Sequence, residues 1–265
     1  MKIHPYLLAL MLPLVMGIAR AQAPVTACIP LRSTPLQADA FWGQDPSGAV
    51  YYSQGNTLYK KTPQQTYAYT YNSFGALTQV DLINPLRLLL FFKTAQVVVV
   101  LDNQCNEIDQ LHLGALPGDL WIDRTGLAGQ NYWWGFDVNS SRWGLIDNRN
   151  NQWRPVGPNE ASERKAYYTD YNCAQWVNGL GQWWRMDLFG EARRVAQLPA
   201  TAQSMVFVGG QGLLYQLDGQ WWLQYSNAPE PLRIGWEAKW PFAACYSNQI
   251  LAIFTGTEIV EYQLK

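Results

Sequence analysis

Short apolar segments follow one another along nearly the whole chain, and residues typical of turns separate them. The segments are rich in Val, Leu, Tyr and Trp, and the residues between them are mainly Gly, Asn, Asp, Pro and Ser. This pattern predicts short strands joined by tight turns. No segment has the period of an amphipathic helix, and no leucine heptad occurs. The pattern therefore predicts an all-β fold.

The predicted strands fall into groups of four that recur about every forty residues. Five complete groups span residues 40–71, 78–113, 119–156, 166–197 and 204–236, with the first strand of the third group expected at 119–123. A last group, 241–264, has only three strands, and a spare strand at 27–32 precedes the first group. A propeller closes its ring by sharing one blade between the two termini. The sequence thus predicts a six-bladed β-propeller whose last blade is closed by the N-terminal strand.

Other all-β folds share parts of this pattern. A β-sandwich or barrel also has many short strands, and boundary errors of several residues leave five or seven blades open. The regular period and the shared last blade favour the propeller. The mature region, 22–265, is then a single domain, at a size where all-β chains often stay undivided.

The first 21 residues have the pattern of a signal peptide. Lys2 precedes an apolar run at 6–18, and Ala19-Arg20-Ala21 offers a cleavage site that gives a mature start at Gln22. A cut after Ala23 also fits the small-residue rule but would place Pro24 directly behind it. The run is too short to span a membrane, and no later segment is long enough. We expect a periplasmic protein, associated with the outer membrane.

Lipid attachment is an alternative mode of anchoring. The segment Val25-Thr26-Ala27-Cys28 resembles the sequence before a lipidated cysteine in bacterial lipoproteins. The apolar run, however, ends about ten residues before Cys28, and Arg20 interrupts the interval. A lipid at Cys28 is therefore the less favoured interpretation.

The charge of the chain argues against two classes of partner. The sequence has 19 Lys and Arg against 20 Asp and Glu, and its basic residues are scattered. A near-neutral chain of this kind does not favour nucleic acid or an anionic membrane surface. Sparse charge and abundant aromatic residues also exclude a disordered chain and a coiled coil.

Tryptophan pairs stand inside the predicted strands. The pairs are Trp133-Trp134, Trp183-Trp184 and Trp221-Trp222. Neighbouring residues of a strand point to opposite faces of the sheet, and both faces of a propeller blade pack on other blades. The pairs therefore predict core packing rather than a sugar-binding surface. The unbroken apolar runs at 88–92 and 97–101 likewise predict fully buried strands.

The sequence predicts no catalytic residue, no metal site and no cofactor. His112 is the only histidine beyond the signal peptide, and we expect it on the solvent side of an outer strand. Asp102, Asp147, Asp187 and Asp218 stand at strand ends, where aspartate commonly bonds the turn backbone. Paired-carboxylate catalysis or calcium binding by these residues is the less favoured interpretation. No calcium loop, phosphate-binding loop or nucleophile elbow is present.

Four cysteines in an exported chain would ordinarily suggest two disulfides. The strand assignment argues otherwise, because Cys105 and Cys173 fall in non-adjacent blades. Cys28 and Cys245 fall on the outermost and innermost strands of the closing blade. Three strand spacings come to about 14 Å, whereas a disulfide tolerates about 4–7 Å between Cα atoms. We predict mostly free, buried thiols.

Several motifs in the first half of the chain resemble one family. They are Pro35-Leu36-Gln37-Ala38-Asp39, Asn56-Thr57-Leu58-Tyr59-Lys60-Lys61, Asn84-Pro85-Leu86-Arg87-Leu88-Leu89-Leu90-Phe91-Phe92-Lys93, Val99-Val100-Leu101-Asp102-Asn103 and Asn106-Glu107-Ile108. Across 35–108 the chain resembles uncharacterised cell-envelope β-propellers of the Bacteroidota. The resemblance implies a periplasmic propeller and, weakly, the plug-like periplasmic subunit of the type IX secretion translocon. It supplies no catalytic residues.

These observations favour a non-enzymatic scaffold or accessory subunit of an outer-membrane complex that binds envelope or outer-membrane proteins. Function commonly lies in loops on a rigid frame. The longest predicted loop, 157–165, is also the most charged, and we predict that it binds the partner through Glu160, Glu163, Arg164 and Lys165. A solvated loop without a partner, a carbohydrate-binding propeller, and a propeller lyase, lactonase or glycosidase are the alternatives, since the fold alone does not specify function.

Overall fold

The computed structural model describes residues 25–235 and 243–264. The predicted signal peptide, 1–21, and both candidate cleavage sites lie outside the described residues, as do residues 241 and 242 of the last predicted group. Within the described residues the one helix is a 3₁₀ turn, η1 (Leu113–Ala115), and no helix is long and apolar enough to cross a membrane.

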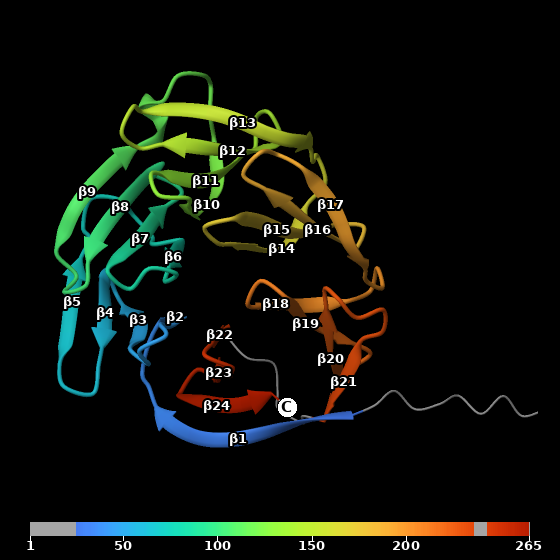
Figure 1. The fold of residues 1–265 in the computed structure, drawn as a ribbon. Helices are drawn as coiled ribbons and strands as arrows, with labels where there is room; N and C mark the ends of the chain where they lie inside the picture. Colours follow the sequence, from blue (N-terminus) through green and yellow to red (C-terminus); the bar gives the residue numbers. More distant parts are fainter. Residues whose placement is uncertain (1–24, 236–242, 265) are drawn as a thin grey trace, which may run out of the picture.

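Antiparallel four-stranded sheets form a ring of six blades (Figure 1). Blade 1 contains β2 (Ala40–Gln44), β3 (Val50–Gln54), β4 (Thr57–Lys61) and β5 (Thr66–Thr70). Blade 2 contains β6 (Gln79–Asp81), β7 (Arg87–Phe92), β8 (Val97–Asp102) and β9 (Glu107–His112). Blade 3 contains β10 (Ile122–Ala128), β11 (Tyr132–Asp137), β12 (Arg142–Asp147) and β13 (Gln152–Asn159).

The second half of the chain repeats this plan. Blade 4 contains β14 (Arg164–Thr169), β15 (Cys173–Asn178), β16 (Gln182–Asp187) and β17 (Ala192–Gln197). Blade 5 contains β18 (Gln203–Val208), β19 (Gly212–Leu217), β20 (Gln220–Tyr225) and β21 (Leu232–Gly235). Blade 6 contains β22 (Ala243–Ser247), β23 (Ile250–Phe254), β24 (Glu258–Leu264) and, from the other end of the described chain, β1 (Val25–Pro35). The predicted six-bladed all-β propeller is confirmed.

The N-terminal strand closes the ring, as the sequence predicted. β1 pairs antiparallel with β24 from Cys28 opposite Leu264 to Pro35 opposite Glu258. It also extends beyond the predicted 27–32, and its first three residues pair in parallel with β21 of blade 5. Figure 1 shows β1 passing along the outside of β24 and reaching β21. Blades 5 and 6 thereby become one eight-stranded sheet.

The first strand of blade 3 was predicted at the wrong place. The expected strand at 119–123 is replaced by β10, which begins at Ile122 and continues to Ala128. Gly126 inside this strand is typical of a turn in the sequence, but here it permits a close approach between blades. A Cβ atom at this position would lie 2.0 Å from Thr169 Oγ1 of blade 4.

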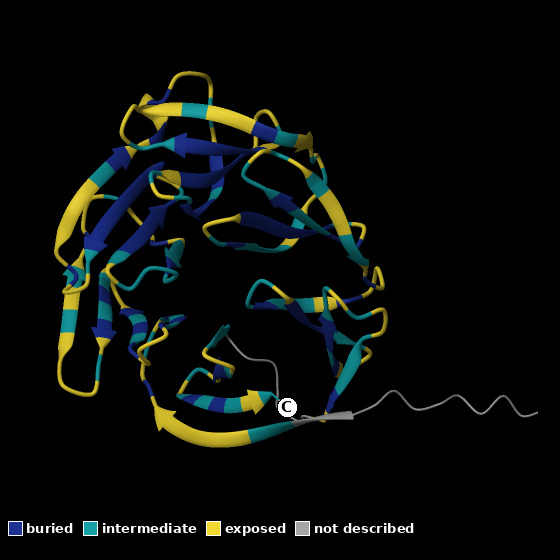
Figure 2. Cartoon of the chain, in the orientation of Figure 1, coloured by how far each residue is buried: buried dark blue, intermediate teal, exposed yellow. Residues whose placement is uncertain are grey.

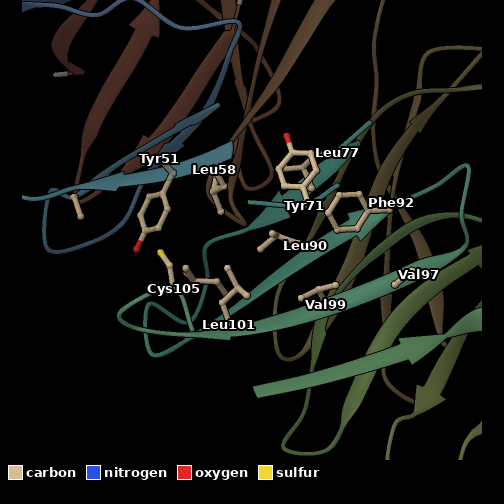
Figure 3. Packing of buried hydrophobic residues seen from close by; sticks show 12 residues of the cluster. Tyr51, Leu58, Tyr71, Leu77, Leu90, Phe92, Val97, Val99, Leu101 and Cys105 are labelled. Atoms are coloured by element: carbon tan, nitrogen blue, oxygen red, sulfur yellow. The ribbon is translucent and has the colours of Figure 1, made fainter. Parts of the chain in front are cut away.

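Six apolar clusters fill the spaces between neighbouring blades. The middle strands carry most of the buried residues, whereas the outer strands are largely exposed (Figure 2). Figure 3 shows the cluster between blades 1 and 2, where Tyr51 and Leu58 lie across from Leu90 and Leu101. The predicted buried runs of β7 and β8 form the blade 2 side of this cluster and of the next one.

Each tryptophan pair divides between two clusters, as the alternation of a strand requires. Trp133 packs between blades 2 and 3, and its neighbour Trp134 packs between blades 3 and 4. The pairs in blades 4 and 5 divide in the same way. The core role predicted for these residues is confirmed.

The aspartates at strand ends stabilise turns. The carboxylates of Asp102, Asp147 and Asp187 each accept hydrogen bonds from backbone N–H groups of the turn that follows. Asp218 differs, because it and Gly219 form a two-residue hairpin in which both have positive φ (51° and 74°). Asp-Gly is a preferred pair for such a turn.

The four cysteines are free thiols at separate places in the ring. Cys105 and Cys173 are buried, as predicted, and burial raises the pKa of each thiol to about 11. Cys28 and Cys245 lie on the outermost and innermost strands of blade 6, also as predicted, but both are only half-buried.

A buried carboxylate joins the two ends of the ring. Arg32 on β1 donates two hydrogen bonds, of 2.7 and 2.8 Å, to the carboxylate of Glu261 on β24. Gln44 on β2 of blade 1 donates a third, of 2.8 Å. The Arg32 side chain is 61 % exposed, but that of Glu261 is only 5 % exposed. Burial opposes ionisation of Glu261, but the hydrogen bonds from Arg32 and Gln44 hold its pKa below the ordinary value.

Arg32→Ala should lower the free energy of unfolding by about 2 kcal/mol, because it leaves a buried carboxylate with one amide donor. The melting temperature should fall by about 4–8 °C. Arg233→Ala is the matched control, since Arg233 on β21 makes only exposed hydrogen bonds to Gln220. Its cost should stay within about 0.5 kcal/mol. Equal losses in the two variants would contradict the closing role of Arg32.

The same carboxylate predicts a dependence of stability on pH. The pKa of Glu261 is lower in the folded protein than in the unfolded chain, so its ionised carboxylate stabilises the fold at pH values above the ordinary glutamate pKa. This contribution is lost as the pH falls through the folded-state pKa. Glu261→Gln should therefore be less stable than the wild type at about pH 6, and the difference should shrink towards about pH 3. Denaturant titrations of both proteins at each pH measure this difference; a constant gap would contradict the argument.

Candidate functional site

The loop predicted to bind a partner is shorter than 157–165. Residues 157–159 belong to β13 and Arg164 begins β14, so only residues 160–163 connect blades 3 and 4. Pro155, Gly157 and Pro158 are typical of a loop in the sequence. They are tolerated in β13 because it is the outer strand of its blade, where one edge has no partner strand in the sheet.

Glu160 in this connection faces the protein. Its carboxylate accepts hydrogen bonds from Trp176 Nε1 at 3.2 Å and Asn178 Nδ2 at 3.4 Å, both in blade 4. It also accepts bonds from the backbone N–H and hydroxyl of Ser162. Burial opposes ionisation, but these donors hold the pKa of Glu160 below its ordinary value. Glu160 thus fastens the connection to blade 4.

The other three predicted residues have different surroundings. The Arg164 guanidinium packs over the ring of Phe136 in blade 3, and its Nη2 lies 3.7 Å from Asp123 Oδ2. Lys165 Nζ donates to the carbonyl of Ala200 at 3.1 Å but remains exposed. Glu163 is exposed as well. Glu163 and Lys165 are therefore accessible to a partner, whereas Glu160 and Arg164 are mainly engaged within the fold.

A larger candidate site lies on one face of the ring. Because consecutive strands of a blade alternate in direction, the turns between its first and second strands and between its third and fourth strands share one face, here called face A. A pocket of about 690 Å³, the blade 3 pocket, opens there. Turns of blades 2, 3 and 4 line it, with Asn84, Arg87, Leu127, Gly129, Gln130, Asn131, Tyr132, Trp133, Asn148, Arg149, Tyr171 and Asn172.

Side-chain caps hold the turns around the blade 3 pocket. Asn84 Oδ1 accepts the N–H of Leu86 at 3.1 Å. Asp147 Oδ1 accepts the N–H of Arg149 at 3.0 Å, and hydrogen bonds from the following Asn150 lower its pKa. Asp170 Oδ1 accepts the N–H of Asn172 at 2.8 Å. Turns capped in this way present their side chains from a fixed backbone.

Bonds between blades fix these turns relative to one another. The N–H of Gly129 donates to the carbonyl of Tyr171 at 2.8 Å, and Trp134 Nε1 donates to the carbonyl of Asp170 at 2.8 Å. Gly129 has a φ of +50°, which a glycine adopts without strain. The N–H of Leu127 donates to Asp81 Oδ2 at 2.8 Å. Three consecutive blades therefore act as one rigid wall of the pocket.

The pocket combines cationic, amide and aromatic groups. Among the described residues that line it, two are arginines, five are Asn or Gln, and none is acidic. Arg87 Nη2 lies 3.7 Å from Asp109 outside this lining. Two polar atoms of the pocket, Arg87 Nε and Asn148 Oδ1, are buried without a hydrogen-bond partner within the described protein. An unsatisfied polar atom of this kind costs about 1–3 kcal/mol.

Exposed apolar side chains also lie on face A. Leu86 follows the first strand of blade 2 and is 70 % exposed, and Phe189 in the last turn of blade 4 is 89 % exposed. Tyr132 and Tyr171, which line the pocket, are also exposed. Large exposed apolar side chains that gather beside a pocket are typical of binding surfaces.

His112, the histidine considered for catalysis, lies outside the blade 3 pocket. His112 ends β9, the outermost strand of blade 2, and is exposed, as predicted. Its ring Nε2 lies 2.8 Å from Gln110 Nε2. Within the described residues no group of three or more His, Cys, Asp or Glu side chains is arranged to hold a metal ion.

Sequence reasoning missed the blade 3 pocket, although two signals pointed to it. Asn84-Pro85-Leu86-Arg87 belongs to one of the family-like motifs and carries an apolar residue inside a turn. The turn 129–131 is followed by Tyr132, an aromatic residue at the exposed end of a strand. In the sequence, both segments resemble ordinary turns. In the folded ring, they line the same pocket.

Comparison with known proteins shows the fold. No family model matches the chain, and no curated protein matches its sequence. The structure is similar to that of virginiamycin B lyase from Staphylococcus aureus, with a TM-score of 0.58, 12 % identity, and coverage of 88 % of this chain and 99 % of the lyase chain. It is also similar to PorZ, a surface component of the type IX secretion system of Porphyromonas gingivalis. Here the TM-score is 0.52, with 13 % identity over 84 % of this chain and 31 % of PorZ.

Glu160→Ala should destabilise the protein by about 1–3 kcal/mol, because Trp176 Nε1 loses its acceptor and Asn178 Nδ2 loses one of its two acceptors. Glu163→Ala is the matched control, since it removes an exposed carboxylate from the same connection, and its effect should stay within about 0.5 kcal/mol. Chemical denaturation of both variants measures the difference. Equal stability would show that Glu160 does not fasten the connection.

Proposed function

We propose that this protein is a non-enzymatic β-propeller of the bacterial cell envelope that binds other proteins, with the blade 3 pocket as its docking site. The occupant is an extended segment of a partner protein. The grouping of Arg87, Arg149, Tyr132 and Tyr171 with five amide side chains in one pocket carries this proposal, because it places hydrogen-bond donors and acceptors beside aromatic surface. A peptide backbone offers both complementary groups at every residue.

The surroundings of the pocket support a protein ligand. Tyrosine and arginine are enriched among the residues that dominate binding energy in protein interfaces. Tyr132, Tyr171, Arg87 and Arg149 all line the pocket, and the exposed Leu86, next to Arg87 in the chain, extends the contact area. Because two arginines and no described acid line the pocket, a segment with carboxylate side chains complements it best.

The predicted signal peptide and the fold support a place in the cell envelope. A periplasmic protein with this architecture could act as an accessory subunit of an outer-membrane complex. The similarity to PorZ supports the type IX protein secretion translocon as that complex, in agreement with the family resemblance of residues 35–108. The chain corresponds to about a third of PorZ, so this assignment concerns a propeller module.

The proposal of a non-enzymatic role rests on the chemistry of the pocket. Its described lining offers guanidinium, amide and phenol groups but no histidine, carboxylate or thiol that could act as a general base near neutral pH. His112 is not among the residues of the lining. The similarity to virginiamycin B lyase concerns the fold and transfers no catalytic residue.

Carbohydrate binding is the second candidate function. The specific observation in its favour is a lining of five amide side chains beside Tyr132 and Tyr171, because amides bond sugar hydroxyls and aromatic rings can stack on sugars. Trp133 at the pocket would report such a ligand through its fluorescence.

Affinity capture from solubilised envelopes tests the proposed function. The wild type should retain a defined partner protein, and Tyr132→Ala combined with Arg149→Ala should lower its affinity at least tenfold, because both exposed side chains line the pocket. Leu180→Ala is the matched control, since Leu180 is exposed on the opposite face. Melting curves confirm that all three proteins are folded.

Two results would overturn the proposal. Undiminished capture by the double variant would exclude the blade 3 pocket as the docking site. Saturable quenching of tryptophan emission by a glycan, lost in the double variant, would assign the pocket to carbohydrate instead.

A further inference from the structure

A second pocket lies on the axis of the propeller. The innermost strands β10, β14, β18 and β22 contribute to its lining, and its volume is about 450 Å³. It extends from Arg164, the first residue of β14, to Gly209, which follows β18. We call it the axial pocket. Its lining shares no residue with that of the blade 3 pocket.

Positive charge gathers at one end of the axial pocket. Lys93, Arg124 and Arg164 all lie within ion-pair distance of one carboxylate, Asp123, with Arg124 at 3.2 Å and Arg164 at 3.7 Å. Of these three cations Arg124 and Arg164 line the pocket, and Lys165 is the third cation of the lining. Asp123 and Glu160 both act electrostatically on Arg164. Among the described residues that line the pocket, three are cationic and none is acidic.

Two further acidic groups, Asp81 and Asp170, lie at the other end of the inner strands. Asp81 ends β6 and accepts backbone N–H groups of Ile83 and Leu127, and Asp170 follows β14 and caps a turn. Burial raises the pKa of Asp81, which favours its neutral form. An anion is therefore favoured at the end where Arg124 and Arg164 lie.

The two arginines are held in position by aromatic rings. The guanidinium carbon of Arg164 lies 3.5 Å from the ring centroid of Phe136, and that of Arg124 lies 5.1 Å from the ring of Tyr167. The Arg164 side chain is only 13 % exposed, and its Nε is buried without a hydrogen-bond partner within the described protein. Burial, and then the neighbouring Arg124, act to lower the pKa of Arg164. An added anion would offset the repulsion between the two guanidinium groups.

The rest of the lining is largely apolar. Tyr168 and Phe207 form a tilted ring pair with centroids 5.9 Å apart, and Met205 and Tyr246 complete this wall. A stacked, oriented guanidinium binds carboxylate and phosphate oxygens through paired hydrogen bonds. We propose that the axial pocket binds a small organic oxyanion, a carboxylate or a phosphate, whose apolar or aromatic body packs against Tyr168 and Phe207.

Thermal melting and calorimetry with phenyl phosphate, benzoate and inorganic phosphate test this proposal, each against sodium chloride at equal ionic strength. At least one aromatic anion should raise the melting temperature by several degrees and bind at one site. Stronger binding of phenyl phosphate assigns phosphate, and stronger binding of benzoate assigns carboxylate. Inorganic phosphate should bind at least tenfold more weakly than phenyl phosphate, because it lacks the apolar body.

Variants locate the site. Arg124→Gln should weaken binding of the aromatic anion at least tenfold, and Lys165→Gln, at an exposed position, should weaken it about threefold. Arg149→Gln is the matched control, because it makes the same change in the blade 3 pocket, and it should leave the affinity unchanged.

Three results would overturn the inference. These are a melting shift no larger than that of sodium chloride, a shift that persists in both Arg124→Gln and Lys165→Gln, and binding that is lost in Arg149→Gln. The first two results leave protein capture by face A untouched, because the two pockets have separate linings. The third would place the anion in the blade 3 pocket instead.

Discussion

Closure of the ring by β1 is the constraint on which the other features of this propeller depend. Arg32 and Glu261 are 229 residues apart in the chain, and their pairing joins the last blade to its fourth strand. Gln44 extends the same contact to blade 1, and the parallel pairing of β1 with β21 extends the closure to blade 5. Three blades thus depend on one strand. Because each blade packs on two neighbours, an open ring would expose apolar clusters on both sides of the gap.

Aromatic side chains packed between neighbouring blades make the closed ring rigid. Trp133 and Trp134 lie next to each other in β11 but belong to different clusters, so a single strand couples three blades. The indole of Trp134 also bonds the carbonyl of Asp170 in the next blade. The turns of blades 2, 3 and 4 therefore keep fixed positions on face A, and a pocket formed by three separate turns can keep one shape.

The two pockets use the same frame in different ways. The blade 3 pocket is built from turns, with exposed tyrosines and amides that suit a large ligand lying across face A. The axial pocket is built from inner strands, and its charge is concentrated around Asp123 by residues of blades 2, 3 and 4. The sequence suggested that Arg164 lies in a binding loop. In the structure Arg164 begins the inner strand β14, and it therefore belongs to this charged cluster.

The all-β class, the six blades, the shared last blade and the burial of the tryptophan pairs can be predicted from the sequence. These features follow from local alternation and turn chemistry, which operate over a few residues and repeat with a regular period. The parallel contact of β1 with β21, the place of β10 and the roles of Glu160 and Arg164 emerge instead from the three-dimensional packing. The two pockets also belong to the tertiary structure, since each combines residues from several blades. Distances between blades depend on ring closure and on packing. A local sequence pattern therefore cannot predict them.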